Sequence, residues 1–207
     1  MGRSILGRAA ALDRKKNFFF LAARAALATA VLIGAAARGD HARPTLLALE
    51  QGTLTYTVVH KLHEVKGTTR KLEGLARLQP GGPTQVQVRV PVGSFDSGNS
   101  NRDAHMREAT HEPLHPFAEV KGTLPAITLP LSGPQDLTLD ARVELNGIQH
   151  KQAIPVHLEP SGERGVRARF TFPISLDAFQ VERPELLMIK VDDRATISGD
   201  LLFSVRA

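Results

Sequence analysis

The chain has 207 residues with 13 Pro, 17 Gly, no Cys and no Trp, and its formal net charge is +5. The absence of cysteine excludes a disulfide framework, a thiolate metal site, a cysteine nucleophile and the lipid-modified cysteine of bacterial lipoproteins. Residues 1–43 contain eight basic and two acidic residues, which leaves 18 basic and 19 acidic residues in the remainder. The remainder is therefore nearly neutral, and the basic composition does not indicate a nucleic-acid partner.

Residues 1–37 are predicted to be an export signal. Arg14, Lys15 and Lys16 precede an apolar stretch at 18–37, and the alanines at 35–37 offer a cleavage site. Because Arg24 interrupts the stretch, a cleaved signal and an uncleaved inner-membrane anchor both remain open. In either case the protein is expected to be periplasmic or secreted, with membrane contact only through this segment. Residues 38–52 are predicted to be a linker.

From residue 53 onward, apolar and polar side chains alternate as in β-strands with one buried face. The clearest runs are residues 53–59, 84–90, 137–145, 166–172 and 197–205, and weaker runs are 70–78, 117–124, 150–158 and 187–191. Asn146-Gly147 is the strongest hairpin signal between them. Antiparallel strands with so long an apolar face must close or pair with a second sheet. We therefore predict an all-β chain with an eight-stranded antiparallel barrel over residues 53–207, with a sandwich as the alternative.

The stretch SFDSGNSNRDAHMR at 94–107 interrupts the alternation. Ser100 as N-cap and Asp103 in the first turn predict one short helix near residues 100–109. Arg102, Asp103 and His105 suggest acid–base catalysis, but neighbouring residues of a helix point in different directions. We interpret the stretch as a plug at one barrel end, in which Asp103 caps backbone amides and Arg102 pairs with a strand carboxylate.

Five segments in order resemble the YceI-like family of exported proteins. They are VVHKLHEVKG, VPVGSFDSGNSNRDAHMRE, LHPFAEVKG, FTFPISLDAFQV and VDDRATISGDL. The resemblance implies an extended, lipocalin-like, eight-stranded antiparallel barrel with a tunnel for a long isoprenoid or another lipid. Six residues are assigned to a structural motif on this basis: His60, Ser94, Asp96, Arg102, Asp103 and His105.

The predicted tunnel lining consists of inward-facing, mostly apolar side chains. Eight of the predicted ligand-binding residues come from the alternating strands, and Phe95 and Met106 come from the turn and short helix at 94–107. The full set is Tyr56, Val58, Val86, Val88, Phe95, Met106, Leu139, Phe170, Phe172 and Phe203. Each buried methylene of a ligand contributes about 0.8 kcal/mol, so such a site needs no cofactor, metal or catalytic residue.

Two alternatives to lipid binding remain open. One is a metal-dependent enzyme, which would use the histidines between residues 60 and 115, namely His60, His63, His105, His111 and His115. The other is a ligand-free structural or stress-related envelope protein, because an apolar lining is also what an ordinary close-packed core looks like. The sequence also leaves a homodimer open.

Overall fold

The computed structural model describes residues 43–60, 63–183, 185–186 and 189–206. The predicted signal segment at 1–37 lies outside the described residues, as do residues 187–188 of the weak strand prediction at 187–191. Among the described residues, no helix has the length and apolarity needed to cross a membrane.

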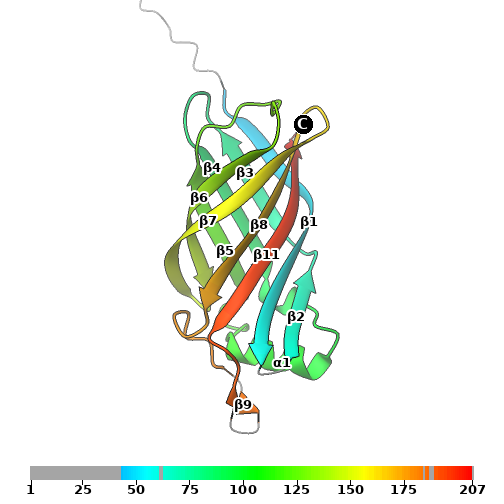
Figure 1. The fold of residues 1–207 in the computed structure, drawn as a ribbon, viewed down its shortest axis with the longest axis vertical. Coiled ribbons are helices and arrows are strands. Elements are labelled where there is room, and N and C mark those ends of the chain that lie inside the picture. The colour runs from blue at the N-terminus through cyan, green and yellow to red at the C-terminus, as the bar shows by residue number, and fades with distance from the viewer. Residues whose placement is uncertain (1–42, 61–62, 184, 187–188, 207) are drawn as a thin grey trace, which may run out of the picture. The chain divides into compact units, whose positions relative to one another are not determined.

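The fold is a closed antiparallel barrel (Figure 1). Its strands are β1 (Thr45–His60), β2 (His63–Thr69), β3 (Glu73–Leu78), β4 (Thr84–Pro91), β5 (Phe117–Leu124), β6 (Gln135–Leu145), β7 (Ile148–Ser161), β8 (Gly165–Ser175), β9 (Glu185–Leu186), β10 (Ile189–Lys190) and β11 (Arg194–Val205). The sheet order is β11-β8-β7-β6-β5-β4-β3-β1, and pairing of β1 with β11 closes this eight-stranded ring. The predicted eight-stranded barrel is confirmed, and the sandwich is wrong.

The first strand corrects the predicted linker boundary. β1 begins at Thr45, so residues 45–52, assigned to the linker 38–52, belong to the barrel wall. The register against β11 shifts between Leu49 and Gln51, which marks a β-bulge. Leu47 lines the interior before the bulge and Leu54 after it, so the inward positions change from odd to even numbers. This change of phase hid residues 45–52 from a search for strict alternation.

Strand β2 was not predicted. It pairs with the second half of β1, while β3 pairs with the first half, so the two strands share one edge of β1. Its inward positions are occupied by Val65, Gly67 and Thr69, and of these only the valine gives an apolar strand signal. Because β3 begins at Glu73, the predicted run 70–78 covers the break between the two strands as well as β3.

The hairpin between β6 and β7 has the predicted turn. Asn146 and Gly147 both have positive φ, at 53° and 72°, as a type I′ turn requires. β7 and β8 pair only where residues 156–161 face residues 165–170. Pro155 immediately precedes the paired residues of β7 and has no N–H with which to extend the ladder. The two strands are therefore unpaired toward the end of the barrel where the β6–β7 turn lies.

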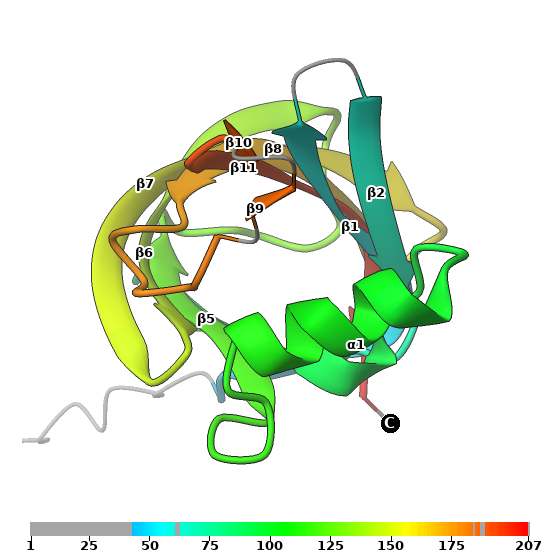
Figure 2. The same cartoon turned by 90° about the horizontal axis from the view of Figure 1, so that it is seen from below.

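The same end carries the only α-helix among the described residues, α1 (Ser100–Ala109), which follows the short 3-10 helix η1 (Val92–Ser94). Figure 2, which looks into this end, shows α1 along one side of the opening and the chain that follows β8 along the other. We call this end the mouth. At the opposite end, the loop between β5 and β6 buries Ile127 and Leu131 in the apolar core.

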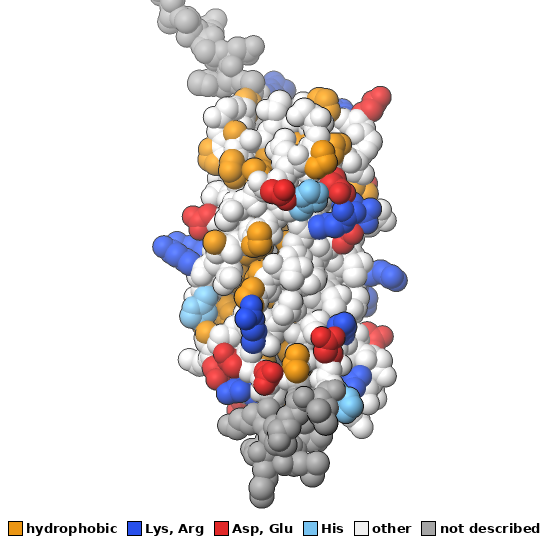
Figure 3. Space-filling view, viewed as in Figure 1, with side chains coloured by type: hydrophobic (Ala, Val, Ile, Leu, Met, Phe, Trp, Pro, Cys, Tyr) orange, Lys and Arg blue, Asp and Glu red, His pale blue; other side chains and the backbone are white. Residues whose placement is uncertain are grey.

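Charged side chains occupy many outward positions of the barrel. On the face shown in Figure 3, acidic and basic side chains are interspersed. Arg167 and Arg169 both bond Asp200, and Arg169 also reaches Glu159. Because these pairs occupy the outward positions of β7, β8 and β11, the inward positions of the same strands are left to apolar side chains.

Candidate functional site

The barrel interior holds a cavity of about 350 Å³. Its walls include side chains of α1 at the mouth and Ile127 at the opposite end, so it runs along the barrel axis. The volume lies in the lower part of the range of roughly 300–1,000 Å³ that is usual for small-molecule pockets. The interior is therefore hollow, unlike that of an ordinary close-packed core.

Aromatic rings that lie flat on the wall help to keep the interior open. A Cβ atom at Gly199 of β11 would lie 2.2 Å from Cζ of Phe170 on β8. A Cβ atom at Gly67 of β2 would likewise lie 2.3 Å from Cε1 of Tyr56 on β1. Each ring occupies the space of a missing side chain on the neighbouring strand, and less of the ring projects into the lumen.

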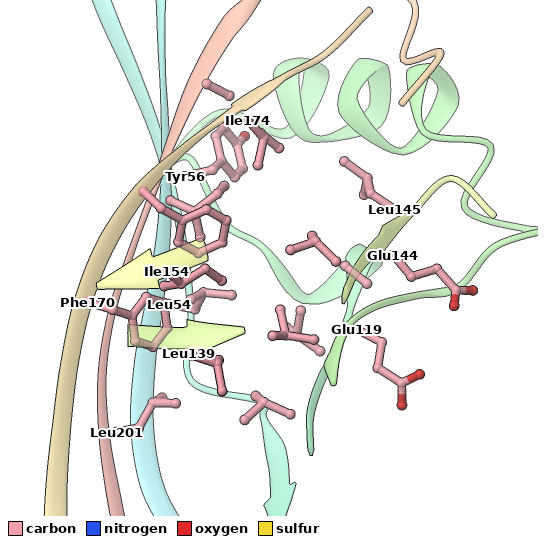
Figure 4. Close-up of a pocket in the computed structure, with 18 of the residues that line it drawn as sticks. Leu54, Tyr56, Glu119, Leu139, Glu144, Leu145, Ile154, Phe170, Ile174 and Leu201 are labelled. Atoms are coloured by element: carbon pink, nitrogen blue, oxygen red, sulfur yellow. The ribbon is translucent and has the colours of Figure 1, made fainter. Parts of the chain in front are cut away.

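All ten residues predicted to line a tunnel line this cavity. They are Tyr56, Val58, Val86, Val88, Phe95, Met106, Leu139, Phe170, Phe172 and Phe203. Figure 4 shows Tyr56 and Phe170 together with Leu54, Leu139, Ile154 and Leu201, which come from five strands of the wall. Their contact with a lipid stays a prediction. Leu54, Ile154 and Leu201 were missing from the predicted set, although the alternation places them on the same inward faces.

Ser94 and Asp96 tie the loop after β4 to the free edge of β2. The Ser94 hydroxyl donates to the carbonyl of Pro91 at 2.6 Å and bonds the Thr69 hydroxyl at 2.8 Å. The backbone of Asp96 makes a two-bond bridge with Thr68, at 2.9 and 3.0 Å. The Asp96 carboxylate accepts from Gly98 N at 2.7 Å, which forms the turn. These contacts hold the loop against the edge of β2 that has no neighbouring strand, and so close this side of the mouth.

Asp103 and Arg102 both hold the same loop. Asp103 is buried and its Oδ1 accepts from the backbone of Ser97, as expected for a capping carboxylate. Arg102 donates to the carbonyl and hydroxyl oxygens of Ser97 instead of a strand carboxylate, so that prediction is wrong. The N-cap is Asn99, whose side chain accepts from Asn101 N and Arg102 N, and not Ser100. Asn and Ser are nearly equal as N-caps, so composition does not choose between adjacent candidates.

The ionisable groups that border the cavity gather at the mouth. Arg102 and His105 come from α1, Glu119 and Glu144 are partners across β5 and β6, and Glu182 follows β8. Figure 4 shows the carboxylates of Glu119 and Glu144 pointing away from the apolar side chains. Although partial burial opposes it, hydrogen bonds from Lys121 and Gln87 hold the pKa of the Glu119 carboxyl below its usual value.

Tyr56 places a phenol between this charged rim and the apolar interior. Its ring meets that of Phe95 edge-on, with centroids 5.3 Å apart. Burial raises the pKa of the Tyr56 hydroxyl, and the Asp103 carboxylate raises it further, while Arg102 opposes them. The hydroxyl is therefore protonated at neutral pH and offers a neutral hydrogen-bonding group.

The segment at 176–181 forms the second side of the mouth. Asn146, buried in the β6–β7 turn, donates from Nδ2 to the carbonyls of Phe179 and Gln180, each at 3.1 Å. His150 on the unpaired part of β7 bonds the carbonyl of Ala178 at 2.9 Å, and its ring packs edge-on against buried Phe179. Glu182 N reaches the carbonyl of Ala109 at 3.4 Å, so the segment meets the end of α1.

The histidines proposed as metal ligands do not form a described three-ligand group, although two of them meet the β6–β7 turn. His111 bonds Asn146 Oδ1 at 3.0 Å, and the ring of His115 lies over Gly147. His60 ends β1, and its side chain lies outside the described part of the structure. Among the side chains that are described, no group of three His, Cys, Asp or Glu is placed to hold a metal ion.

Comparison with known proteins identifies the domain. Residues 47–203 match the family model described as the YceI-like domain. A UPF0312 protein of Shewanella baltica is 30% identical over 125 residues, which are 58% of this chain and 64% of that protein. A UPF0312 protein of Shewanella oneidensis matches with the same identity and coverage. The alignment thus spans slightly less than two thirds of the length of these relatives.

Solved structures share the fold at low sequence identity. A polyisoprenoid binding domain from Saccharophagus degradans, implicated in plant cell wall breakdown, has a TM-score of 0.62 at 14% identity, covering 77% of this chain and 98% of that one. BcnA of Burkholderia cenocepacia has a TM-score of 0.59 at 18% identity, covering 73% and 95%. The YCEI protein of Campylobacter jejuni has a TM-score of 0.52 at 11% identity, covering 72% and 89%.

Proposed function

Because the chain belongs to the YceI-like domain family, we propose that it is an exported, non-catalytic protein that holds a long-chain isoprenoid or other apolar amphiphile inside its barrel. The observation that carries this proposal is the apolar cavity of about 350 Å³ along the barrel axis. The polyisoprenoid binding domain from Saccharophagus degradans has the same fold, which supports the choice of ligand class.

Apolar burial supplies the affinity for such a ligand. At about 0.8 kcal/mol for each methylene removed from water, ten buried carbons contribute about 8 kcal/mol before the cost of ordering the chain. An eight-stranded barrel is just wide enough to hold one small ligand, which favours a linear or singly branched chain over a fused ring system. An isoprenoid chain longer than the cavity would leave its remaining units at the mouth.

The mouth is the route by which we propose that the lipid enters. Glu182, directly after the segment at 176–181, makes a backbone contact with Ala109 at the end of α1, and β7 and β8 are unpaired beside it. A separation of these two pieces exposes the cavity without breaking the ladders of the closed ring. The polar rim of Arg102, His105 and the glutamates then remains in water while the apolar chain passes inside.

We also propose that residues 1–37 direct the protein out of the cytoplasm, where it is periplasmic or secreted, with the uncleaved anchor as the alternative. The order of basic residues, apolar stretch and alanines supports this address. N-terminal sequencing of the protein from the cell envelope tests it. A mature chain that begins at Arg38 fits cleavage, and an intact chain in the membrane fraction fits the anchor.

Native mass spectrometry of the protein purified from its own cell envelope without detergent tests the lipid-binding role. We expect a population heavier than the polypeptide by the mass of one lipid, and organic extraction should release a species with an isoprenoid fragmentation pattern. A bound polar metabolite, or protein that stays empty after incubation with lipid extract from the same envelope, would contradict the proposal.

A further inference from the structure

The loop that follows α1 exposes apolar residues at the mouth. Pro113, Leu114 and Pro116 are exposed, as is Phe117, which opens β5. Leu114 is 75% exposed, the largest value among the exposed large apolar side chains of the described residues. Single exposed apolar residues are common, but four within five consecutive positions form a group of the kind that marks a contact surface. We call residues 110–116 the mouth loop.

The mouth loop has a defined shape. His111 Nδ1 lies 3.0 Å from Asn146 Oδ1, and the ring of His115 lies over Gly147, so both histidines rest on the β6–β7 turn. The backbone N–H groups of Leu114 and His115 both donate to the carbonyl of His111 at 2.9 Å. Because its neighbours on both sides are held in place, Leu114 is kept in solvent by a built turn.

The backbone of the mouth loop is suited to an apolar medium. The N–H groups of residues 110–112 donate to carbonyls of α1 at 2.9 to 3.1 Å, and those of Leu114 and His115 are bonded within the loop. Pro113 and Pro116 have no N–H. Every backbone N–H from residue 110 to 116 is therefore satisfied inside the chain, as a bilayer requires because it offers no hydrogen-bond partners.

Exposed apolar side chains are concentrated at this end of the barrel. Val59, near the end of β1, lies at the mouth together with Leu114 and Phe117, whereas Leu46 and Leu75 lie in the half where β1 pairs with β3. The hairpin of β9 and β10 forms a sheet separate from the barrel, and Figure 1 shows β9 projecting beyond α1 at the same end. The opening of the cavity is thus bordered by elements that extend outward.

The chemistry of the proposed cargo identifies the partner of this surface. Each methylene of a long-chain lipid that must cross water slows its transfer by a factor of roughly four. A chain of many methylenes therefore moves between a bilayer and a protein far faster when the opening touches the bilayer. The partner that fits an apolar loop beside the opening is the membrane in which the lipid is dissolved.

The charges around the mouth do not favour anionic lipid. Residues 100–121 contain three basic and four acidic residues, and residues 176–193 contain two basic and five acidic residues. Attraction to anionic headgroups needs a cluster of basic residues, which this end lacks. Apolar contact must therefore provide the affinity, and salt should not weaken it.

We propose that the mouth docks on the surface of a lipid bilayer, with Leu114 and its neighbouring prolines inserted among the lipids, and that the cargo passes between bilayer and barrel without crossing water. This inference rests on the proposed lipid-binding function and adds the source from which the lipid is taken. It also adds a second membrane contact to the one expected through residues 1–37.

The absence of tryptophan allows a site-specific test on the exported protein as isolated from the envelope. Leu114→Trp places one fluorophore in the mouth loop, and Leu75→Trp, at another exposed leucine, is the matched control. On vesicles of phosphatidylcholine, the emission of Leu114→Trp should shift to shorter wavelength and be quenched by brominated acyl chains more strongly than that of Leu75→Trp. Added phosphatidylglycerol should not increase the quenching. Equal quenching at both positions would overturn the proposal, and so would no quenching at position 114, which would leave this surface to a protein partner.

The uptake of a polyprenol from phosphatidylcholine vesicles is the second readout. Leu114→Asp should slow uptake by roughly tenfold or more, the factor expected when the burial of one leucine is lost. The final amount of bound polyprenol and the melting temperature should remain those of wild type. Leu75→Asp is the matched control and should take up the polyprenol at the wild-type rate. Equal uptake rates in Leu114→Asp and wild type would contradict docking through the mouth loop.

The outcomes separate this inference from the proposed function. If wild type binds polyprenol but Leu114→Trp is not quenched by the vesicles, the lipid-binding role stands and docking at the mouth is wrong. If Leu114→Trp is quenched but the protein takes up no lipid, the contact with the bilayer stands and the lipid-binding role is wrong.

Discussion

Gly199 lies under the ring of Phe170, and a Cβ atom at Gly199 would come within 2.2 Å of the ring. Because the two residues are partners across β8 and β11, the ring rests on the neighbouring strand and leaves the lumen free. The hollow interior thus depends on the absence of a side chain as much as on the residues that are present. Gly67 and Tyr56 repeat this arrangement nearer the mouth.

Substitution of Gly199 should therefore close part of the cavity. Gly199→Ala forces the Phe170 ring into the lumen, and we expect a loss of about 1–3 kcal/mol in the free energy of unfolding together with weaker lipid binding. Adding Phe170→Leu should restore much of both. Denaturant unfolding and lipid titration measure these effects. Gly133→Ala is the control, because nothing lies within 4 Å of its Cβ position, and unchanged properties in Gly199→Ala would count against the role of this contact.

Two buried alanines distinguish the cavity from the packed wall. Ala168 lines the cavity and Ala141 does not, although both are buried on inward faces. Ala168→Leu should fill empty space with little loss of stability and should reduce lipid uptake. Ala141→Leu should instead overpack the wall and lower the free energy of unfolding by about 1–3 kcal/mol. Equal destabilisation by the two substitutions would mean that the side chains around Ala168 are packed as tightly as those around Ala141.

Asn146 is expected to control the mobility of the mouth. Asn146→Gly keeps the positive φ but removes the two bonds to Phe179 and Gln180, and we expect about 1–3 kcal/mol lower stability of the segment at 176–181. Asn146→Asp should be at least as harmful, because it places an acceptor against two carbonyl oxygens. Hydrogen exchange of this segment should become faster in both variants, and lipid should be released sooner. Exchange that accelerates uniformly over the barrel would point to global destabilisation instead.

The stability of the mouth should also depend on pH through Asp193. Hydrogen bonds from Asp177 N, at 2.7 Å, and from the Ser175 side chain lower the pKa of the Asp193 carboxyl. A carboxyl whose folded-state pKa is depressed stabilises the fold above its unfolded pKa of about 3.9, and this contribution is lost as the pH falls through the folded-state pKa. Because the group is partly exposed and screened by solvent, its contribution is about 1 kcal/mol or less.

Asp193→Asn tests this dependence. Its melting temperature should lie slightly below that of wild type at pH 6 to 8, and the two should converge as the pH falls below about 4. A constant difference across this range would show that ionisation of Asp193 does not matter, and a difference that grows in acid would have the wrong sign.

The barrel was predictable from sequence because period-two alternation fixes which side chains face inward. The residues Val86, Val88, Leu139 and Phe172 were placed correctly for that reason. The start of β1 was not predictable because one bulge near Glu50 reverses the alternation, and β2 was missed because Gly67 and Thr69 stand at its inward positions.

The mouth was only partly predictable. The helix and the capping role of Asp103 could be predicted because they depend on residues close together in the sequence. The bond from Arg102 to Ser97 depends on how the loop before the helix folds. The bonds from Asn146 to the segment at 176–181 join residues more than 30 positions apart in the sequence.

Isothermal titration calorimetry of the lipid-free protein with a linear polyprenol tests the central claim most directly. We expect one molecule bound per chain with a negative heat-capacity change, since apolar surface is buried on binding, and weaker binding by Ala168→Leu. Absence of binding, or equal binding by wild type and Ala168→Leu, would contradict the claim that the apolar interior of the barrel is the site.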